Sequence, residues 1–180
     1  MNENKWVKIV KELLTWVLTI GLAVVAANLI TKYIIIKAEV PTGSMENTIM
    51  PDDCILGFQQ AYLFSDPKRG DIVIFPFPDD PEIIYVKRII GLPGETVEIK
   101  DGYVYIDGEP LEESYVKDST LGEYGPYEVP EDSYFMLGDN RNSSADSRRW
   151  DNTYLKGEDI IAKVLFRYSP SFYWYPKAEY

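Results

Sequence analysis

Histidine is absent from this sequence of 180 residues. A Ser-His-Asp triad or a Cys-His pair therefore cannot be built from the chain's own side chains, and zinc sites with imidazole ligands are excluded as well. If the protein performs hydrolysis, its base has to be Lys, Asp, Glu or Tyr, and its nucleophile Ser, Thr or an activated water. We expect neither a metal nor another cofactor.

Cysteine and basic residues are also scarce. The single cysteine, Cys54, cannot form an intramolecular disulfide, and we expect it to be a small, partly buried side chain without a catalytic role. Lys and Arg number 18 against 29 Asp and Glu, which gives a formal net charge of −11. Because nucleic-acid binding needs a basic face to neutralise phosphates, no nucleic-acid partner is expected.

A long apolar run lies near the N-terminus. Residues 13–30 carry no charge over 18 positions, which is the usual length of a membrane-spanning helix. A cleaved secretory signal is the main alternative, but its apolar region is about 7–15 residues, and here the run continues into the isoleucines at 34–36. A buried soluble helix is a further alternative, although no other helical pattern could cover it on all sides. The length favours a retained anchor.

The expected orientation of this anchor follows from the lysines on its two sides. Lys5, Lys8 and Lys11 precede the run, whereas Lys32 and Lys37 follow it. This small excess favours a cytoplasmic N-terminus. Because no second stretch approaches spanning length, everything after residue 36 is expected on the other side of the membrane.

The pattern after the anchor changes from helical to strand-like. Strands are predicted at residues 71–75, 83–90, 96–106, 134–137 and 160–168, separated by proline and glycine. Asp101-Gly102 divides the third of these into a β-hairpin, since the pair tolerates the positive φ of a tight turn, and Asp107-Gly108 predicts the next turn. Residues 112–132 are interpreted as a surface excursion. The fold class is therefore mainly β, an N-terminal transmembrane helix followed by a β-rich domain.

Lys87 is a candidate base. In a strand over residues 83–90 it shares one face with Ile83, Tyr85 and Ile89, while Arg88 points to the other face. Burial lowers the pKa of a lysine and can leave a neutral amine that accepts a proton. A lysine that reaches water from a sheet edge is the alternative, and this strand alone favours it.

Ser44 is a candidate nucleophile. Pro41 biases Val40 towards extended backbone, and Gly43 permits close backbone approach beside Ser44. An ordinary turn serine or helix N-cap is the alternative.

A third cluster at residues 137–149 packs charges and hydroxyls into a loop directly after a strand. Its alternative is a solvated turn with salt bridges. A surface ion pair usually adds under about 1 kcal/mol to stability, so stability alone is a poor explanation for so dense a run of charges.

Four sequence blocks, taken in order, resemble one family. They are Ser44-Met45, Arg69-Gly-Asp-Ile-Val-Ile-Phe75, Tyr85-Val-Lys-Arg-Ile-Ile-Gly-Leu-Pro-Gly-Glu95 and Gly138-Asp-Asn-Arg-Asn-Ser-Ser-Ala-Asp-Ser-Arg148. The chain resembles a bacterial type I signal peptidase of the short, single-anchor kind over nearly its whole length. Two positions depart from the family's usual pattern, because Asn47 stands where proline is frequent and Ser143 where asparagine is frequent.

The resemblance implies a role for each matched residue. Ser44 would attack the scissile carbonyl, with neutral Lys87 as its general base, and form an acyl-enzyme. Ser144 would hydrogen-bond the Lys87 amine, while the Ser44 backbone N–H and the Thr42 hydroxyl would form the oxyanion hole. Supporting ion pairs that hold the last loop against the catalytic strand are implied at four further positions, Asp139, Asp146, Arg88 and Arg148.

The resemblance also implies substrate and location. The substrates would be secretory preproteins, cut near the membrane lipid after small residues in an Ala-x-Ala-like pattern. Residues 38–42 and 83–86 are candidates for pairing with the extended signal peptide, with Val40, Pro41, Ile84, Tyr85 and Val86 at its contact surface. The expected organisation is a cytoplasmic tail at 1–12, an anchor and stalk at 13–36, and an extracytoplasmic catalytic domain at 37–180.

Two other functions remain possible from sequence. A self-cleaving Ser-Lys protease of the repressor-processing kind shares fold and dyad, but it would require a DNA-binding domain, and the anchor and acidic charge oppose it. A non-catalytic membrane-anchored β domain is the alternative from a different class. The joint presence of Ser44, Lys87 and Ser144 opposes that alternative.

The aromatic segment 172–175 could contact the membrane interface, although such residues more often pack on their own domain.

Overall fold

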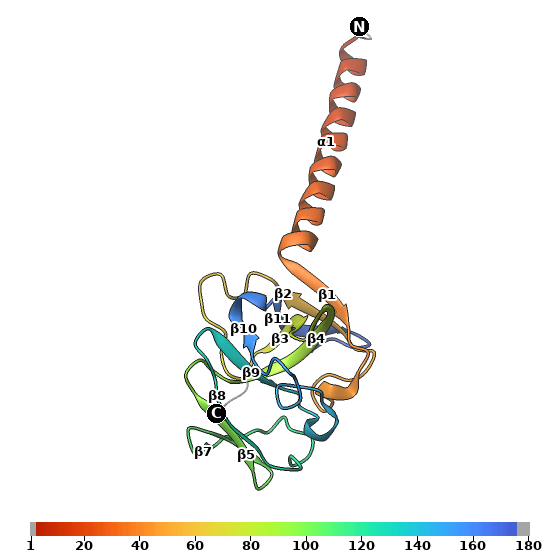
Figure 1. Cartoon of the computed structure of the whole chain (residues 1–180). Helices are drawn as coiled ribbons and strands as arrows, with labels where there is room; N and C mark the ends of the chain where they lie inside the picture. The colour runs from red at the N-terminus through yellow and green to blue at the C-terminus, as the bar shows by residue number, and fades with distance from the viewer. Residues whose placement is uncertain (1–2, 176–180) are drawn as a thin grey trace. The chain divides into compact units, whose positions relative to one another are not determined.

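The computed structural model describes residues 3–175, and the chain separates into two compact units, Met1–Ile35 and Ile36–Tyr180. The first unit is built on one helix and the second on strands (Figure 1). The expected fold class, a mainly β domain preceded by an apolar helix, is confirmed.

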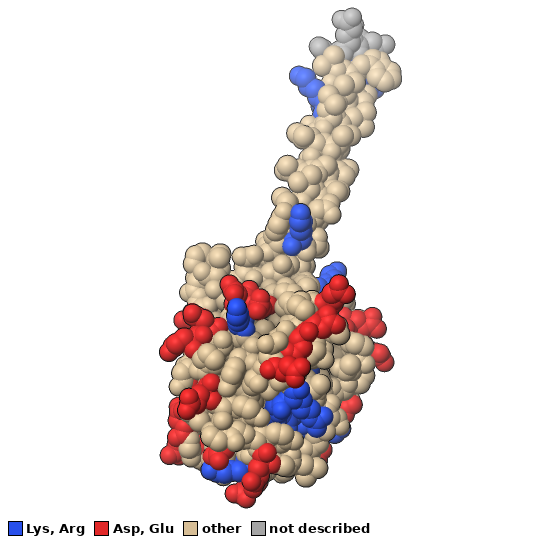
Figure 2. Space-filling model, in the orientation of Figure 1, with Lys and Arg blue, Asp and Glu red and all other residues tan. Residues whose placement is uncertain are grey.

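Helix α1, Glu3–Tyr33, contains the apolar run of the sequence. Within the described part of the chain, its segment Lys5–Tyr33 is the one helix long and apolar enough to cross a membrane. The side of the helix visible in Figure 2 is free of charge along most of its length, with basic side chains near its ends. Thr15, Thr19 and Asn28 each donate a side-chain hydrogen bond to the carbonyl four residues earlier, so these polar groups are satisfied inside the helix.

The isoleucines after the apolar run do not extend this helix. The helix ends at Tyr33, and strand β1, Ile35–Glu39, begins two residues later. Ile36 instead packs against a core cluster of the second unit. Three consecutive β-branched residues favour a strand over a helix, which explains the change.

The second unit contains two antiparallel sheets. The larger has the strand order β1-β2-β11-β3-β4-β9-β10, with β12 added beside β11, and the smaller has the order β7-β6-β5-β8. The strand bounds are β2 Cys54–Phe58, β3 Ile72–Phe77, β4 Asp80–Gly91, β5 Thr96–Lys100, β6 Tyr103–Ile106, β7 Glu109–Pro110, β8 Tyr124–Glu128, β9 Ser133–Leu137, β10 Leu155–Lys156, β11 Ala162–Ser169 and β12 Tyr173–Trp174. Three short 3₁₀ turns interrupt the strands: η1 Gly43–Met45, η2 Arg141–Ser143 and η3 Gly157–Asp159.

Alternation along the central strands assigns their side chains to separate cores. In β3, Ile72 and Ile74 belong to a cluster with Met45, whereas Val73 and Phe75 belong to a cluster on the opposite face. A third cluster joins β4 and β9 of the large sheet to β5 and β6 of the small one. The period of two places polar and apolar side chains of the same strand in different surroundings. This arrangement lets β4 carry both core and site residues.

The predicted hairpin is confirmed in its register. β5 pairs with β6 from Val97↔Ile106 to Lys100↔Tyr103, and Asp101 and Gly102 between them have φ of 52° and 85°. Asp107 and Gly108 form the next turn, with φ of 51° and 88°. Positive φ at all four positions is the conformation for which Asp-Gly pairs are suited.

The interpretation of residues 112–132 as a surface excursion is wrong for part of that range. Residues Tyr124–Glu128 form β8, which pairs with β5. Tyr124 and Tyr127 pack against the cluster that joins the two sheets, and this tertiary burial overrides the turn preference of Gly125 and Pro126.

The aromatic segment 172–175 packs on its own domain. Tyr173 and Trp174 pair with β11, Trp174 stacks on Phe166 with ring centroids 5.5 Å apart, and Tyr175 is buried in the core. Phe172 and Trp174 still expose more than half of their surface.

Candidate active site

Ser44 lies in the middle of η1, directly after the extended segment that follows β1. The backbone is extended at Thr42, which precedes the turn, and Ser44 and Met45 are buried. Met45 anchors the turn in the core, because its side chain is fully buried among the side chains of β2, β3 and β11. Ser44 retains 8% exposure, so its hydroxyl is held at the edge of the core.

Lys87 in β4 meets Ser44 directly. Its Nζ donates a hydrogen bond to Ser44 Oγ at 2.8 Å and another to the Val86 carbonyl at 3.1 Å. Tyr85, two positions earlier on the same face, lies with its ring centroid 4.8 Å from Nζ. Ile89 of this face is buried, whereas Ile83 is exposed, so the apolar face predicted for Lys87 continues in one direction along the strand only.

The surroundings of Lys87 change its acid–base behaviour. The side chain is 4% exposed, and burial lowers the pKa of Lys87 from 10.5 to about 8, against the opposing attraction of Asp146 and Asp139. Removal from water disfavours the ammonium form, and this loss outweighs the attraction to the two carboxylates. A neutral amine 2.8 Å from a hydroxyl is suited to accept its proton.

Gly138 brings the third cluster against Ser44. It follows β9, and a Cβ at this position would overlap Ser144 Oγ and the Ser44 carbonyl oxygen. Asn140 N donates to the Ser44 carbonyl at 3.1 Å, and Asn140 Nδ2 donates to the Gly43 carbonyl at 3.0 Å. The loop after β9 therefore packs directly on the backbone of η1. A side chain at position 138 would push the loop and η1 apart.

Two buried ion pairs lie beside Ser44 and Lys87. Arg88 and Asp139 make a bidentate contact, with Nε–Oδ1 at 2.9 Å and Nη2–Oδ2 at 2.6 Å, and both side chains are almost fully buried. This pair joins β4 to the loop after β9. Arg148 and Asp146 also pair, at 2.8 Å for both contacts, but both belong to the loop itself. The second pair therefore shapes the loop, and Asp146 holds it to β9 by accepting from Gly138 N.

A third buried pair was missed by sequence reasoning. Arg141 contacts Glu113 through two hydrogen bonds of 2.8 and 2.6 Å, and Arg141 Nε donates to the Gly138 carbonyl. Glu113 lies in the segment interpreted as a surface excursion, so no pattern near it indicated a buried partner. The length of that segment was the only available signal, because long loops in compact domains are often functional.

Ser144 and Thr42 lie at the site without the full set of implied contacts. Ser144 is completely buried, yet its Oγ makes no hydrogen bond among the described residues, so the implied bond to Lys87 is not made in this structure. Thr42 Oγ1 lies 3.5 Å from Ser44 Oγ. Ser143, in contrast, is exposed and lines the cleft described next. Asn47 has φ of 86°, a value that the ring of proline cannot adopt.

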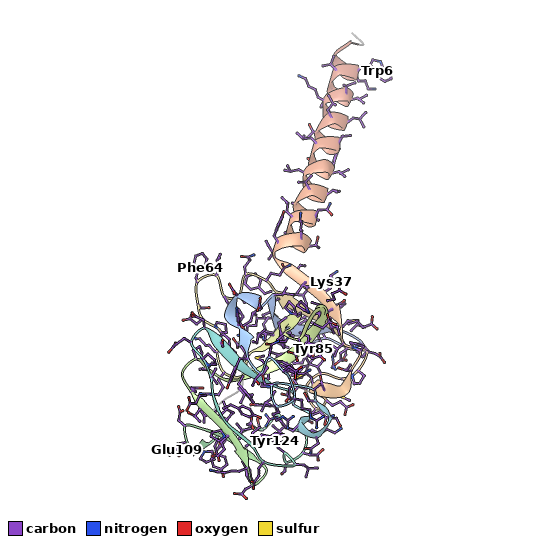
Figure 3. The ribbon with its side chains drawn as sticks, viewed as in Figure 1. Trp6, Lys37, Phe64, Tyr85, Glu109 and Tyr124 are labelled. Carbon is purple, nitrogen blue, oxygen red and sulfur yellow. The ribbon has the colours of Figure 1, made fainter. Side chains whose placement is uncertain are left out.

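A cleft of about 510 Å³ opens at Ser44 and Lys87. Its walls are β1 with the segment after it, and the first half of β4. All five residues proposed from the sequence for substrate contact line it: Val40, Pro41, Ile84, Tyr85 and Val86. Figure 3 labels one side chain from each wall, Lys37 of β1 and Tyr85 of β4.

Both walls of the cleft have unpaired strand edges. Among the described residues, β1 ends the order of the large sheet and pairs only with β2. β4 pairs with β9 only from Arg88 onward, so residues before Arg88 have no strand on that side in the described chain. Free backbone groups at such edges can pair with an extended peptide.

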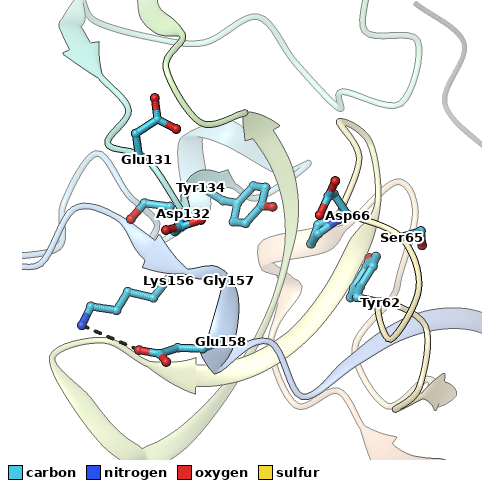
Figure 4. Close-up of a pocket in the computed structure, with 11 residues that line it drawn as sticks. Tyr62, Ser65, Asp66, Glu131, Asp132, Tyr134, Lys156, Gly157 and Glu158 are labelled. Carbon is cyan, nitrogen blue, oxygen red and sulfur yellow. Dashed lines mark ion pairs between the residues drawn. The ribbon is translucent and has the colours of Figure 1, made fainter.

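A second hollow, of about 580 Å³, is acidic and shares no residue with this cleft (Figure 4). It is lined by Asp66, Glu131, Asp132 and Glu158, with the rings of Tyr62 and Tyr134, and Lys156 lies 3.9 Å from Glu158 at its rim. No serine–lysine contact occurs there among the described residues. Acidic side chains are also spread over the visible face of the domain in Figure 2.

Comparison with known proteins places these features in context. The family model described as signal peptidase, peptidase S26, matches residues 13–169. A signal peptidase I of Leptolyngbya laminosa is 39% identical over 159 residues, which cover 84% of this chain and 77% of that protein. A signal peptidase I of Bacillus licheniformis is 37% identical over 158 residues, covering 82% and 84%. A crystal structure of a signal peptidase I from Enterococcus faecalis V583 is 34% identical, with a TM-score of 0.49 over 55% of this chain and 97% of that chain.

Proposed function

Because the chain belongs to the signal peptidase family, peptidase S26, whose members are serine endopeptidases that remove signal peptides, we propose that Ser44 is its nucleophile and Lys87 its general base. The observation that carries this proposal is the 2.8 Å contact between Ser44 Oγ and the buried Lys87 Nζ. A chain without histidine needs another base, and a lysine with a lowered pKa is suited to that task.

The reaction proceeds through an acyl-enzyme. Neutral Lys87 takes the Ser44 hydroxyl proton while Oγ attacks the scissile carbonyl, and the resulting ammonium returns the proton to the leaving amine as the peptide C–N bond breaks. Lys87, neutral again, then takes a proton from water, and the hydroxide attacks the ester bond to Ser44. The acyl group leaves with a new carboxyl terminus, and the proton returns to Ser44 Oγ.

Developing negative charge on the substrate oxygen is stabilised beside Ser44. The Ser44 backbone N–H belongs to the first turn of η1, where N–H groups lack partners within the helix. The Thr42 hydroxyl lies 3.5 Å from Ser44 Oγ and supplies a second donor. Ser144 turns its buried hydroxyl to the Lys87 amine once the substrate is bound, which gives a hydrogen bond to an Oγ that has none within the described part of the chain.

The substrate binds as an added strand between the two walls of the cleft. β1 and the first half of β4 offer free backbone groups to an extended signal peptide. Val40, Ile84 and Val86 give the cleft apolar contacts close to Ser44. Small residues, as in an Ala-x-Ala pattern, are selected because larger side chains would have to displace these walls.

Helix α1 is a single membrane anchor with its N-terminus in the cytoplasm and the β-rich domain outside. Its length, its apolar surface and its internally satisfied threonines support the span. Lys5, Lys8 and Lys11 before it, against Lys32 and Lys37 after it, support the orientation. The proposed boundaries are 1–12 for the tail, 13–36 for the anchor and stalk, and 37–180 for the domain. Anchoring concentrates the enzyme with membrane-held preproteins.

Cleavage of a preprotein with an Ala-x-Ala site tests the dyad. Full-length protein in detergent micelles is compared with Ser44→Ala and Lys87→Ala, and products are identified by mass spectrometry. We expect both variants to lose activity on the order of 10³-fold or more. The exposed Ser65→Ala and Lys156→Met are matched controls, and they should cleave like the wild type. Wild-type rates in either dyad variant would refute the assignment and favour another nucleophile or base, whereas no cleavage by the wild type would favour a non-catalytic domain.

A further inference from the structure

Residues 113–117, called the strap below, contact the turn that carries Ser44. Asn47 Nδ2 donates a hydrogen bond to the Tyr115 carbonyl at 3.0 Å. Lys117 Nζ forms an ion pair with Glu46 of the same turn. Asn47 follows the nucleophile by three residues and has the left-handed backbone that turns favour for asparagine. The turn is therefore tied to a segment about 70 residues later in the sequence.

The strap also contacts the loop after β9. Lys117 N donates to the Asp139 carbonyl at 3.2 Å. Glu113 makes the bidentate contact with Arg141, and this arginine in turn donates to the Gly138 carbonyl. Glu113 and Arg141 expose 7% and 1% of their side chains, so this ion pair is shielded from water. A buried, doubly hydrogen-bonded pair of this kind fixes geometry more firmly than a surface pair.

A third contact reaches the strand that carries Lys87. The guanidinium carbon of Arg88 lies 3.8 Å from the centroid of the Tyr115 ring. Arg88 follows Lys87 directly in β4 and holds Asp139. Tyr115 itself donates its hydroxyl proton to Glu113 at 2.7 Å, which orients its ring within the strap. The strap therefore contacts the turn of Ser44, the loop of Ser144 and the strand of Lys87.

We propose that the strap positions Ser44 relative to Lys87, with Asn47 and Glu113 as positioning residues. This proposal rests on the assignment of Ser44 and Lys87 as nucleophile and base. The turn η1 has three residues and little internal hydrogen bonding, so contacts from outside must hold its orientation. Asn47 provides one such contact, and Glu113 stiffens the segment that receives it. A displacement of about 1 Å at a reacting atom can reduce a rate about 10²-fold.

Two substitutions at Asn47 separate the strap contact from backbone flexibility. Asn47→Asp retains the left-handed conformation but offers no amide donor to the Tyr115 carbonyl. Asn47→Gly also adopts positive φ and removes the side chain altogether. Asp132→Gly is the matched control, since it introduces glycine at a non-glycine position with φ of 58° outside the strap. Ser44→Ala is measured in parallel to test the dyad itself.

The readouts are kcat, KM, the pH of half-maximal rate and the thermal midpoint of full-length protein. Both Asn47 variants should lose about 10- to 100-fold in kcat. Their KM should stay within about twofold and their thermal midpoints within about 4 °C of the control. The pH of half-maximal rate should not move, because the burial of Lys87 is left intact. A kcat loss in Asn47→Gly alone would indicate flexibility and overturn the proposal.

The two proposals fail in different ways. Full activity of both Asn47 variants with an inactive Ser44→Ala would overturn the strap and leave the dyad standing. Full activity of Ser44→Ala would refute the dyad. A lower kcat accompanied by a lower thermal midpoint, or by a half-maximal rate at higher pH, would show that Asn47 only stabilises the fold, since water would then reach Lys87 and raise its pKa.

Discussion

The lowered pKa of Lys87 predicts that activity and stability depend on pH through the same group. In the folded protein the amine is half neutral near pH 8, whereas at its ordinary pKa of 10.5 only about 0.3% would be neutral at that pH. The rate should therefore rise about tenfold per pH unit below pH 8 and level off above it. At pH 6 we expect about 1% of the plateau value of kcat/KM.

Stability follows from the same pKa with a definite sign. Between pH 8 and 10.5 the unfolded chain keeps the Lys87 proton while the folded chain has released it, so stability rises with pH in that window. Below pH 8 the folded protein bears the full free-energy cost of burying the charged Lys87 amine. At about 1.4 kcal/mol per pH unit, the gap from 10.5 to about 8 corresponds to about 3 kcal/mol.

Lys87→Met removes that cost. The difference in free energy of unfolding between this variant and the wild type should be about 2 kcal/mol larger, in favour of the variant, at pH 7 than at pH 9.5. At the higher pH the wild type has already lost part of the cost of burying a charged Lys87. Urea unfolding of full-length protein at both pH values measures the difference, and preprotein cleavage from pH 6 to 10 gives the rate profile. Lys156→Met, whose side chain is 69% exposed, is the control, and its stability difference should not vary with pH.

Two results would refute this reasoning. A rate that stays level from pH 6 to pH 9 would exclude a neutral lysine as the base. A stability difference between wild type and Lys87→Met that is the same at pH 7 and pH 9.5 would mean that burial does not lower the pKa of Lys87.

Three further substitutions test the surroundings of the dyad. Gly138→Ala would push Ser144 and the turn of Ser44 apart. We expect the free energy of unfolding, measured with urea, to fall by about 1–3 kcal/mol. We expect kcat to fall by a larger fraction than thermal stability does. Asp139→Asn leaves the buried Arg88 without its carboxylate and should cost about 3–5 kcal/mol, against less than about 0.5 kcal/mol for the exposed Glu158→Gln. Ser144→Ala removes a buried hydroxyl that has no hydrogen-bond partner among residues 3–175. The thermal midpoint should therefore stay level or rise while kcat falls, and an unchanged kcat would exclude an orienting role.

Much of the architecture was predictable because it follows from local pattern. The Asp101-Gly102 hairpin depends on the φ preference of two residues and on alternation beside them, and its register agrees with that prediction. β8 was missed because Gly125 and Pro126 disrupt its local pattern, and its strand character comes from pairing with β5. The sequence left the end of α1 undefined within residues 13–36, since apolar residues support either a helix or a strand and only packing distinguishes them.

The site shows the same division between local and long-range information. Ser44, Lys87 and the loop after β9 were identified from ordered sequence blocks, and the structure brings the three together. Neither Gly138 as the point of close approach nor the Arg141–Glu113 pair could be inferred, because each depends on segments that meet only after folding. Ser144 lies at the site without the implied hydrogen bond, a detail of side-chain rotation that no sequence pattern contains.

Strand β1 has a consequence for self-association. An edge that accepts an extended peptide could equally accept the edge of a second molecule and start an aggregate. Along β1 the exposed charged side chains Lys37 and Glu39 alternate with partly buried Ile36 and Ala38. Such charged side chains would lose water if another sheet edge approached along the full length of β1, whereas a single flexible peptide leaves them hydrated. The edge of β1 can thus pair with one extended peptide and still disfavour edge-to-edge association of folded domains.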